Sequence, residues 1–345
     1  MKVVAYSVRH FEKELIAKAN QKKHDITLIS NTLDVETAIY AEGKDAAIVF
    51  TNDDVSAPVI NKLADLGIKY IATRSVGTDH IDREAAAKRG IKIANVPSYS
   101  AEAIAEYAAM LALSLGRKII PTVDQVRNFD FRIDEHIGFN FFGKTVGIIG
   151  LGQIGKAAAK IFIGLGCKVL AYDISAQNMK DVRMVDIDML CAKSDIISLH
   201  VPLNNSTKHL VNKKSLSKMK DGVMLINTSR GAVINTEDVL TALSNKKIGA
   251  LGLDVYELEK GLFYFDHRSD TTRDPVIEQL LSFQNVILSP HQAFLTKEAL
   301  QEIALKTIAN LDKWQQNKCV GKACVCTKDC SSISELKKNP ENRML

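Results

Sequence analysis

The sequence predicts an α/β protein in which doubly wound parallel β-sheets are covered by helices. Short apolar, β-branched runs alternate with helical patterns along most of the 345 residues, and this alternation is typical of parallel strands joined by helical crossovers. One run, 146–149, leads directly into a glycine-rich turn and a further helical pattern. The length itself sets a prior of about two domains.

The glycine-rich turn fits the pattern G-x-G-x-x-G between a buried strand and a helix predicted over 156–165. Its residues are Gly150, Leu151, Gly152, Gln153, Ile154 and Gly155. Glycines at these places permit a tight turn and the close approach of a diphosphate, which would lie at the N-terminus of the helix. In this context the turn predicts a Rossmann-type dinucleotide-binding domain, whereas the motif alone would be weak evidence.

A carboxylate follows the next apolar run, 167–172. Asp173 lies roughly 20 residues past the glycines, where a carboxylate can bind the ribose 2′-OH of NAD. Its neighbours are Ile174 and Ser175 rather than an arginine, and a carboxylate there repels a 2′-phosphate. The sequence therefore predicts NAD rather than NADP, although Asp173 could also simply end a strand.

Residues 1–100 predict a smaller, flavodoxin-like α/β domain without a glycine motif, which we expect to bind the substrate. Its predicted strands are 3–6, 26–29, 46–50 and 70–72, and its predicted helices are 12–20, 35–41, 59–66 and 83–89. A long amphipathic helix over 297–316 is expected to return to this domain. The domain would then be discontinuous, made of 1–100 and 297–318.

Residues 101–296 predict the nucleotide-binding domain. Its predicted strands are 145–149, 168–172, 195–199, 223–227, 249–254 and 285–288, which suit a doubly wound sheet. The helix predicted over 101–115 lacks a wide polar face, so we expect it to be buried between domains or subunits. Residues 117–142 are predicted to be irregular and anchored by Phe129, Phe131, Phe139, Phe141 and Phe142.

The composition is that of an ordinary cytoplasmic protein. The net charge is +5 and 25% of the residues are charged. Because the lysines and arginines are scattered, we expect no nucleic-acid surface, whereas the modest positive charge suits acidic small molecules. The sequence offers no uninterrupted run of about 18 apolar residues, so no membrane span is expected, and the start of the chain predicts a strand rather than a signal peptide.

Four of the six cysteines crowd into the segment 319–345, which we expect to be a mobile tail. They are Cys319, Cys324, Cys326 and Cys330. Their spacing lacks the paired C-x₂-C arrangement of structural zinc sites. The sequence therefore predicts no metal site.

Charged side chains follow the later predicted strands. Arg230 comes after the strand at 223–227, Asp254 and Glu259 come after the next, and His291 follows the last. Ligands bind outside the carboxyl ends of parallel strands. These four residues are therefore candidates for one site, although each alone could be an ordinary surface or loop residue.

Several motifs in the same order resemble the D-2-hydroxyacid dehydrogenase family, and within it most of all the fermentative D-lactate dehydrogenases. The resemblance covers residues 1 to about 318. The motifs are R-S-V-G-T-D-H-I-D at 74–82, V-P-S-Y-S at 96–100, the glycine motif at 150–155, H-V-P-L at 200–203, N-T-S-R-G at 227–231, L-D-V-Y-E at 253–257 and P-H-Q-A-F-L-T at 290–296.

The resemblance implies a catalytic trio of Arg230, Glu259 and His291. Arg230 would bind the carboxylate or carbonyl oxygen of a 2-oxo acid through its guanidinium fork. His291 would give a proton to the carbonyl oxygen, and Glu259 would hydrogen-bond the far ring nitrogen. Formate dehydrogenases of the superfamily carry glutamine in place of Glu259, so the carboxylate favours hydroxy-acid chemistry.

The resemblance also implies binding residues. Backbone N–H groups of Val76 and Gly77 would bind the substrate carboxylate. Tyr99 and Phe294 would line a pocket for a small side chain, unless they are core residues. Further cofactor contacts would come from Val201, Pro202, Thr207, Thr228, Ser229 and Asp254. His80 and His209 are expected to be loop histidines without a role.

Together these observations predict an NAD-dependent D-lactate dehydrogenase that reduces pyruvate reversibly. From the family we expect a homodimer that associates through the helix at 101–115 and the nucleotide domain. Two alternatives remain open: a dehydrogenase for bulkier 2-oxo acids, and a non-enzymatic module that senses NAD(H). Relative kcat/KM values distinguish the first, and loss of turnover on substitution of His291 distinguishes the second.

Overall fold

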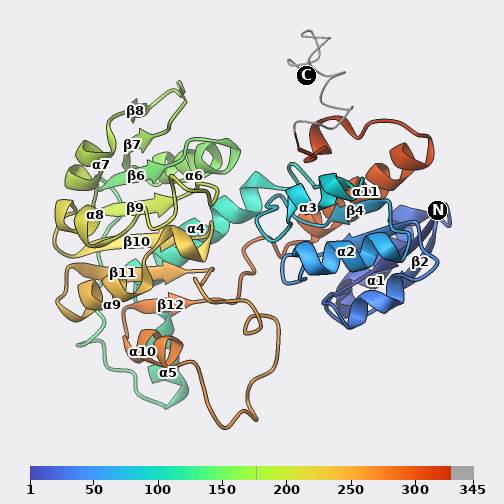
Figure 1. The fold of residues 1–345 in the computed structure, drawn as a ribbon. Coiled ribbons are helices and arrows are strands. Elements are labelled where there is room, and N and C mark those ends of the chain that lie inside the picture. The colour runs from blue at the N-terminus through green and yellow to red at the C-terminus, as the bar shows by residue number, and fades with distance from the viewer. Residues whose placement is uncertain (176, 328–345) are drawn as a thin grey trace. The chain divides into compact units, whose positions relative to one another are not determined.

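The computed structural model describes residues 1–175 and 177–327. The chain divides into two compact units (Figure 1). Unit 1 contains residues 1–100 together with residues 296–327, and unit 2 contains residues 101–295. Each unit is built around its own parallel sheet.

Unit 1 has a five-stranded sheet with the order β2-β1-β3-β4-β5, all parallel, which is the flavodoxin-like order. Its strands are β1 Lys2–Ala5, β2 Asp25–Leu28, β3 Ala46–Val49, β4 Tyr70–Thr73 and β5 Lys92–Ala94. Its helices are α1 His10–Asn20, α2 Ala57–Asp65, α3 Arg83–Lys88, α11 Lys297–Gln315 and the short 3₁₀ helices η1 Thr37–Ala41 and η3 Gly321–Ala323. The segment predicted as a helix at 35–41 is thus a shorter 3₁₀ turn.

Alternate residues of these strands face opposite helical layers. Val4 belongs to the core under α2 and α3, whereas Val3 and Ala5 belong to the core under α1 and α11. This follows from the two-residue period of a strand. The return of α11 to unit 1 makes this unit discontinuous in sequence.

The start of the expected tail is packed against the sheet. Cys324 forms an antiparallel bridge with Ala94 on β5, and Val325 N–H donates to the carbonyl of Ile93. Val320 is buried. Residues 319–327 therefore cover the open edge of β5, which corrects the expectation of a mobile tail there. Cys330 and the rest of that segment lie outside the described residues.

Unit 2 has a seven-stranded parallel sheet with the order β12-β11-β10-β9-β6-β7-β8, which is the Rossmann order with one added strand. Its strands are β6 Thr145–Ile149, β7 Lys168–Tyr172, β8 Val182–Met184, β9 Ile196–Leu199, β10 Val223–Asn227, β11 Ile248–Leu253 and β12 Val286–Leu288. Its helices are α4 Ala101–Gly116, α5 Ile119–Arg127, α6 Gln153–Gly164, α7 Ile187–Lys193, α8 Lys213–Lys218, α9 Thr236–Ser244, α10 Pro275–Ser282 and the 3₁₀ helix η2 Gly231–Val233. The sequence pattern missed the short strand β8 in this unit, as it missed β5 in unit 1.

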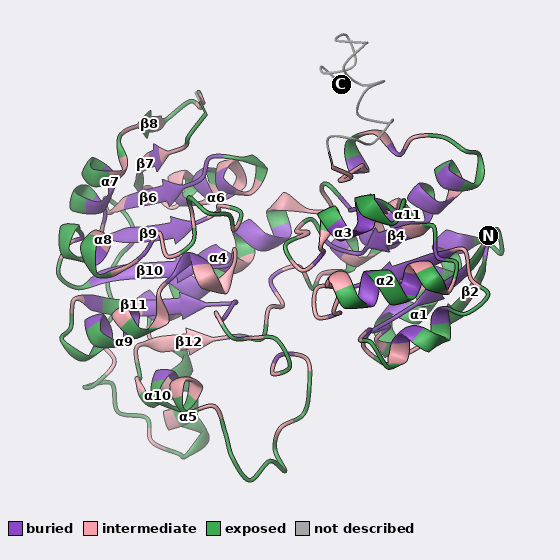
Figure 2. Cartoon of the chain, viewed as in Figure 1, coloured by how far each residue is buried: buried purple, intermediate pink, exposed green. Residues whose placement is uncertain are grey.

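Helix α4 packs on the sheet of its own unit. It shares one core with α6 and the inner strands, while α7, α8 and α9 share the core of the opposite face. Figure 2 shows buried strands between helices whose outer faces are exposed. The buried apolar residues of α4 therefore pack on the sheet of its own unit, and the expected burial between domains or subunits stays a prediction.

The segment 117–142 differs from its prediction. It contains a regular helix, α5, none of whose residues is buried. Of the five expected phenylalanine anchors only Phe141 is buried, whereas Phe129 is 86% exposed. Most of the apolar side chains in this segment therefore face away from the core of their own unit.

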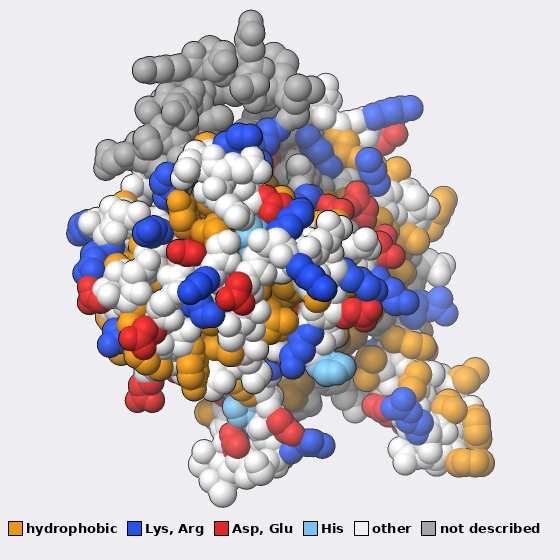
Figure 3. Space-filling model, turned by 90° about the vertical axis from the view of Figure 1, so that its right-hand side faces the viewer, with side chains coloured by type: hydrophobic (Ala, Val, Ile, Leu, Met, Phe, Trp, Pro, Cys, Tyr) orange, Lys and Arg blue, Asp and Glu red, His pale blue; other side chains and the backbone are white. Residues whose placement is uncertain are grey.

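No helix within residues 1–175 and 177–327 is long and apolar enough to cross a membrane. Over the face shown in Figure 3, Lys and Arg side chains are interspersed with Asp and Glu. That face therefore carries mixed charge.

Candidate functional site

The glycine turn connects β6 to α6 and has room for a diphosphate. Gly150 has a φ of 94°, and a Cβ at this residue would overlap the carbonyl of His200. A Cβ on Gly155 would overlap the carbonyl of Gly150. By contrast, Gly152 begins α6 without a side-chain cap and has open space around its Cβ position. The turn thus leaves uncapped helix N–H groups beside an open surface, which fits a bound dinucleotide.

Asp173 lies directly beside this turn. Its Oδ2 accepts a hydrogen bond of 2.7 Å from the backbone N–H of Leu151, and its Oδ1 accepts one of 2.8 Å from Ser175. These bonds hold the carboxylate at the end of β7, next to β6 in the sheet. Gln153 and Ile154 form the first turn of α6.

The other expected cofactor residues follow β9 and β10, the strands that continue the sheet beyond β6. Val201 and Pro202 come after β9, and the Thr207 hydroxyl donates to the carbonyl of Pro202 at 2.6 Å. Thr228 and Ser229 come after β10. The buried Thr228 hydroxyl has no hydrogen-bond partner in the described part of the chain, as expected of a group that awaits a ligand.

His291 and Glu259 form a close pair. Nδ1 of His291 lies 2.6 Å from Oε1 of Glu259, and the other carboxylate oxygen accepts a hydrogen bond of 3.0 Å from the N–H of Tyr256. The backbone of His291 is also held, because its N–H donates to the carbonyl of Asp254 and its carbonyl accepts from the Tyr264 hydroxyl. Both the ring and its main chain are therefore fixed.

Asp254 holds the backbone segment on which His291 lies. It is fully buried at the end of β11. Its carboxylate accepts hydrogen bonds from the Ser289 hydroxyl and from the N–H groups of Gln292 and Ala293, at 2.7 to 2.9 Å. Burial raises the pKa of Asp254, and these hydrogen bonds oppose that effect. The carboxylate thus holds the segment that carries His291.

Arg230 follows β10, the neighbour of β11. Asn227 fixes its backbone, since the side-chain amide donates to the carbonyl of Arg230 at 2.9 Å and accepts from Ser229. Nη1 of Arg230 donates to the Ser229 carbonyl at 2.7 Å. A Cβ on Gly231 would overlap the backbone of Tyr256, so the Arg230 and Glu259 loops pack directly on each other.

The expected substrate residues are divided between the two units. Val76 and Gly77 follow β4 in unit 1, where the Ser75 hydroxyl donates to the carbonyl of Gly77 at 2.7 Å. Tyr99 follows β5 in the same unit, and Phe294 lies three residues past His291 in unit 2. Both rings are half-buried rather than core residues.

A family model described as D-isomer specific 2-hydroxyacid dehydrogenase, NAD binding domain, matches residues 109–293. The chain belongs to this family. It is 44% identical over 321 residues to the D-lactate dehydrogenase of Curvularia clavata, covering 91% of this chain and 92% of that protein. Unit 2 of this 2-hydroxyacid dehydrogenase is accordingly its NAD-binding domain.

Solved structures of the family share the fold. The pyruvate reductase of Chlamydomonas reinhardtii matches with a TM-score of 0.88 at 40% identity, covering 93% of this chain and 98% of that one. The D-lactate dehydrogenase of Aquifex aeolicus, complexed with NAD and lactic acid, matches with a TM-score of 0.85 at 30% identity, covering 94% and 99%.

Two side chains near the dehydrogenase site escaped the sequence prediction. His209 was expected to be a loop histidine without a role, and Glu257 was not given a role of its own. In the structure Nε2 of His209 lies 2.5 Å from Oε1 of Glu257. The only sequence signal was the position of Glu257 two residues before Glu259, and its partner is 48 residues away.

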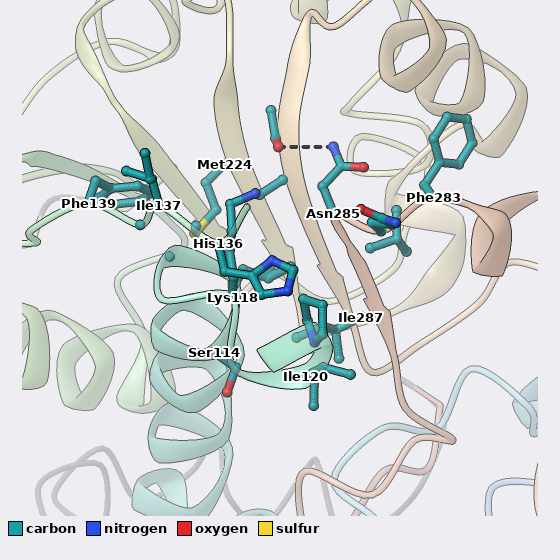
Figure 4. A pocket seen from close by; sticks show the side chains of 18 of the residues that line it. Ser114, Lys118, Ile120, His136, Ile137, Phe139, Met224, Phe283, Asn285 and Ile287 are labelled. Carbon is teal, nitrogen blue, oxygen red and sulfur yellow. Dashed lines mark hydrogen bonds between the residues drawn. The ribbon is translucent and has the colours of Figure 1, made fainter. Parts of the chain in front are cut away.

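A hollow of unit 2 lies at the other end of its sheet. It has a volume of about 1040 Å³, and its lining includes Lys144, Asp195 and Asn285, which directly precede strands. Side chains of α4, of the segment 135–139 and of β12 also line it (Figure 4). Because the glycine turn and His291 follow the carboxyl ends of strands, this hollow is separate from the candidate dehydrogenase site.

Proposed function

We propose that this chain is a D-lactate dehydrogenase that reduces pyruvate with NADH and oxidises D-lactate with NAD. The observation that carries the proposal is the His291–Glu259 pair, at 2.6 Å, on loops packed against the Arg230 loop. The names of relatives support the substrate: one is a D-lactate dehydrogenase, one a pyruvate reductase, and one holds NAD and lactic acid.

The three side chains have complementary roles in the proposed reaction. The Arg230 guanidinium binds the anionic 2-oxo acid and polarises its carbonyl. Nε2 of His291 gives a proton to the carbonyl oxygen, and it takes the hydroxyl proton in the reverse direction. Glu259 holds Nδ1 and stabilises the imidazolium form. The nicotinamide of NADH, when bound, supplies the hydride.

The binding residues follow from the same proposal. The N–H groups at Gly152, Gln153 and Ile154 bind the diphosphate, and Asp173 binds the ribose hydroxyls. The rest of the cofactor site is lined by residues that follow β9 and β10, namely Val201, Pro202, Thr207, Thr228 and Ser229. Asp254, which follows β11, supports this site.

In unit 1, backbone N–H groups of Val76 and Gly77 bind the substrate carboxylate. Tyr99 and Phe294 limit the size of the substrate side chain. Because one methylene in an apolar pocket is worth about 1–3 kcal/mol, these rings can separate pyruvate from bulkier acids by only about 10- to 200-fold.

A substrate panel tests the proposed function. Pyruvate, 2-oxoisocaproate and phenylpyruvate are each assayed with NADH and with NADPH, and kcat/KM is measured. Pyruvate with NADH should give the highest value. A several-fold preference for phenylpyruvate would make the chain a dehydrogenase for bulkier acids, and no turnover with any of the three would leave a binding module.

We further propose that the chain forms a homodimer through unit 2. Apolar side chains of the segment 119–142 are exposed, among them Ile120, Phe129 and Ile133, at 51%, 86% and 85%. Exposed apolar side chains gathered in one segment are typical of interaction sites. Light scattering should give twice the mass of one chain, and Phe129→Ser with Ile133→Ser should give the single mass. A wild-type protein at the mass of one chain would contradict the proposal.

A further inference from the structure

A second histidine–glutamate pair lies beside the proposed catalytic pair. Nε2 of His209 and Oε1 of Glu257 are 2.5 Å apart, and both side chains are largely buried, at 32% and 22% exposed. The other carboxylate oxygen accepts hydrogen bonds from the Thr236 hydroxyl at 2.9 Å and from the Thr236 N–H at 3.3 Å. One carboxylate therefore joins three segments that are distant in sequence.

Each of these three segments carries a residue of the proposed site. The first runs from Val201 through Thr207 to His209. The second contains Arg230 and continues to Thr236, and the third contains Glu259, two residues beyond Glu257. A shift of any one segment would therefore change the distance between groups that must act together.

The backbone around the pair is tightly connected. The N–H of His209 donates to the carbonyl of Ala232 at 2.8 Å, and Val211 forms a parallel bridge with Ile234. His209 has a φ of 51°, a left-handed conformation that a non-glycine residue keeps only when its surroundings determine it. The loop is thus held in one position with its imidazole directed at Glu257.

The electrostatic environment keeps Glu257 charged. Burial raises the pKa of its carboxyl, but hydrogen bonds from His209 and Thr236 outweigh that effect and the pKa lies below its ordinary value. Thr236 is also the first residue of α9, so the carboxylate lies at the positive end of that helix. An ionised Glu257 is the form that can accept all of these hydrogen bonds.

We propose that His209 and Glu257 act as a positioning pair, which holds Arg230 and Glu259 at the distances from His291 that the reaction needs. This inference rests on the proposed function. The pair acts through the loops it joins and does not contact the reacting atoms. Positioning of this kind affects turnover strongly, since a misplacement of about 1 Å can cost about 10²-fold in rate.

The test is a double-mutant cycle with His209→Leu, Glu257→Gln and the double variant. Each single change should lower kcat for pyruvate about tenfold, and the double variant should be no worse than the single ones, because the pair acts as one unit. KM for NADH should change less than about twofold, since the glycine turn is not part of the pair. His209→Gln, which keeps a donor, should recover most of the activity.

The matched control is Asp270→Asn. Nδ1 of His267 and Asp270 form a histidine–carboxylate pair at 2.7 Å on an exposed part of the loop after β11, and its loss should leave kcat unchanged. Thermal unfolding of all variants identifies any that fail to fold. Variants that lose stability but keep the wild-type kcat, or single effects that multiply in the double variant, would overturn the inference.

A second measurement does not depend on turnover. The proton resonance of His291 Nδ1–H, identified by its loss in His291→Gln, should shift in Glu257→Gln and not in Asp270→Asn. If the wild type turns over no 2-oxo acid but this resonance shifts, the proposed function fails and the positioning pair stands. If pyruvate is reduced and neither kcat nor the resonance changes, the positioning pair fails alone.

Discussion

The two units place an arginine at the same edge of the same kind of sheet and use it differently. Arg74 follows β4 in unit 1 and is 1% exposed. It donates to the carbonyls of Tyr6 and Ser7 and forms an ion pair with Glu12 at 3.3 Å. Arg230 follows β10 in unit 2 and is half-buried. A place at the carboxyl edge is therefore insufficient for function, because backbone carbonyls and a carboxylate of the same unit can hold the guanidinium in its interior.

In each unit a buried aspartate holds the loops at the carboxyl edge of the sheet through hydrogen bonds. In unit 1, Asp53 accepts hydrogen bonds from Ser7, Leu33 and Phe50. In unit 2, Asp254 likewise accepts hydrogen bonds from the segment 289–293. The common feature is structural, whereas the uncapped glycine turn and the histidine–glutamate pair occur in unit 2. Seven substitutions test this distinction.

The largest effect is expected at the histidines. His291→Gln should lower kcat by about 10²–10⁴, because the proton donor is lost. His24→Gln in unit 1 removes a buried imidazole bonded to Asp312, and it should lower the melting temperature while leaving kcat unchanged. Steady-state assays with pyruvate and thermal melts measure both. Equal turnover in His291→Gln would remove the catalytic assignment.

Substitution of Arg74 should affect stability, whereas substitution of Arg230 should affect activity. Arg74→Gln leaves the largely buried carboxylate of Glu12 without its cation, so we expect a loss of about 3–5 kcal/mol in the free energy of unfolding. Arg230→Gln should lower kcat/KM by about 10²-fold or more with an unchanged melting temperature, because its charge-assisted bonds to substrate are lost. Urea unfolding and kinetics make the comparison. A stability loss in Arg230→Gln equal to that of Arg74→Gln would erase the distinction.

Two glycines of the same turn in unit 2 should also differ, one in its effect on stability and the other in its effect on cofactor binding. Gly155→Ala would overlap the Gly150 carbonyl and should destabilise the unit, whereas Gly152→Ala has open space and should fold normally. The added methyl in Gly152→Ala should instead raise KM for NADH about tenfold or more, because it lies where the diphosphate approaches. Calorimetry and NADH titration separate the two outcomes. An unchanged NADH affinity in Gly152→Ala would argue against the proposed cofactor position.

The smallest effect is expected at Asp173. Asp173→Ser removes the charge that repels a 2′-phosphate, so the preference for NADH over NADPH should fall about tenfold. The measured quantity is the ratio of kcat/KM for the two cofactors. Because the carboxylate also accepts from Leu151, a parallel measurement of stability serves as the control. An unchanged ratio would place the selectivity elsewhere.

Local patterns predicted the elements that carry the cofactor turn. The bounds of β6, β7 and β10 agree with the expected ones, because these strands are apolar runs of five residues bounded by turn signals. The three-residue strands β5 and β8 were missed because a charged residue, Lys92 or Arg183, interrupts so short a run, whereas β12 of the same length is apolar throughout. Helix α5 was missed because it buries no apolar face.

The sequence by itself determined both fold classes and the cofactor turn, and through family motifs it predicted the trio Arg230, Glu259 and His291. It did so because these signals are local: a glycine spacing, an apolar period, a motif. Only the tertiary structure brought Glu257 to His209 and residues 319–327 to the edge of β5. Those contacts join residues far apart in the chain, and side-chain partners of that kind are set by how the strands and loops pack.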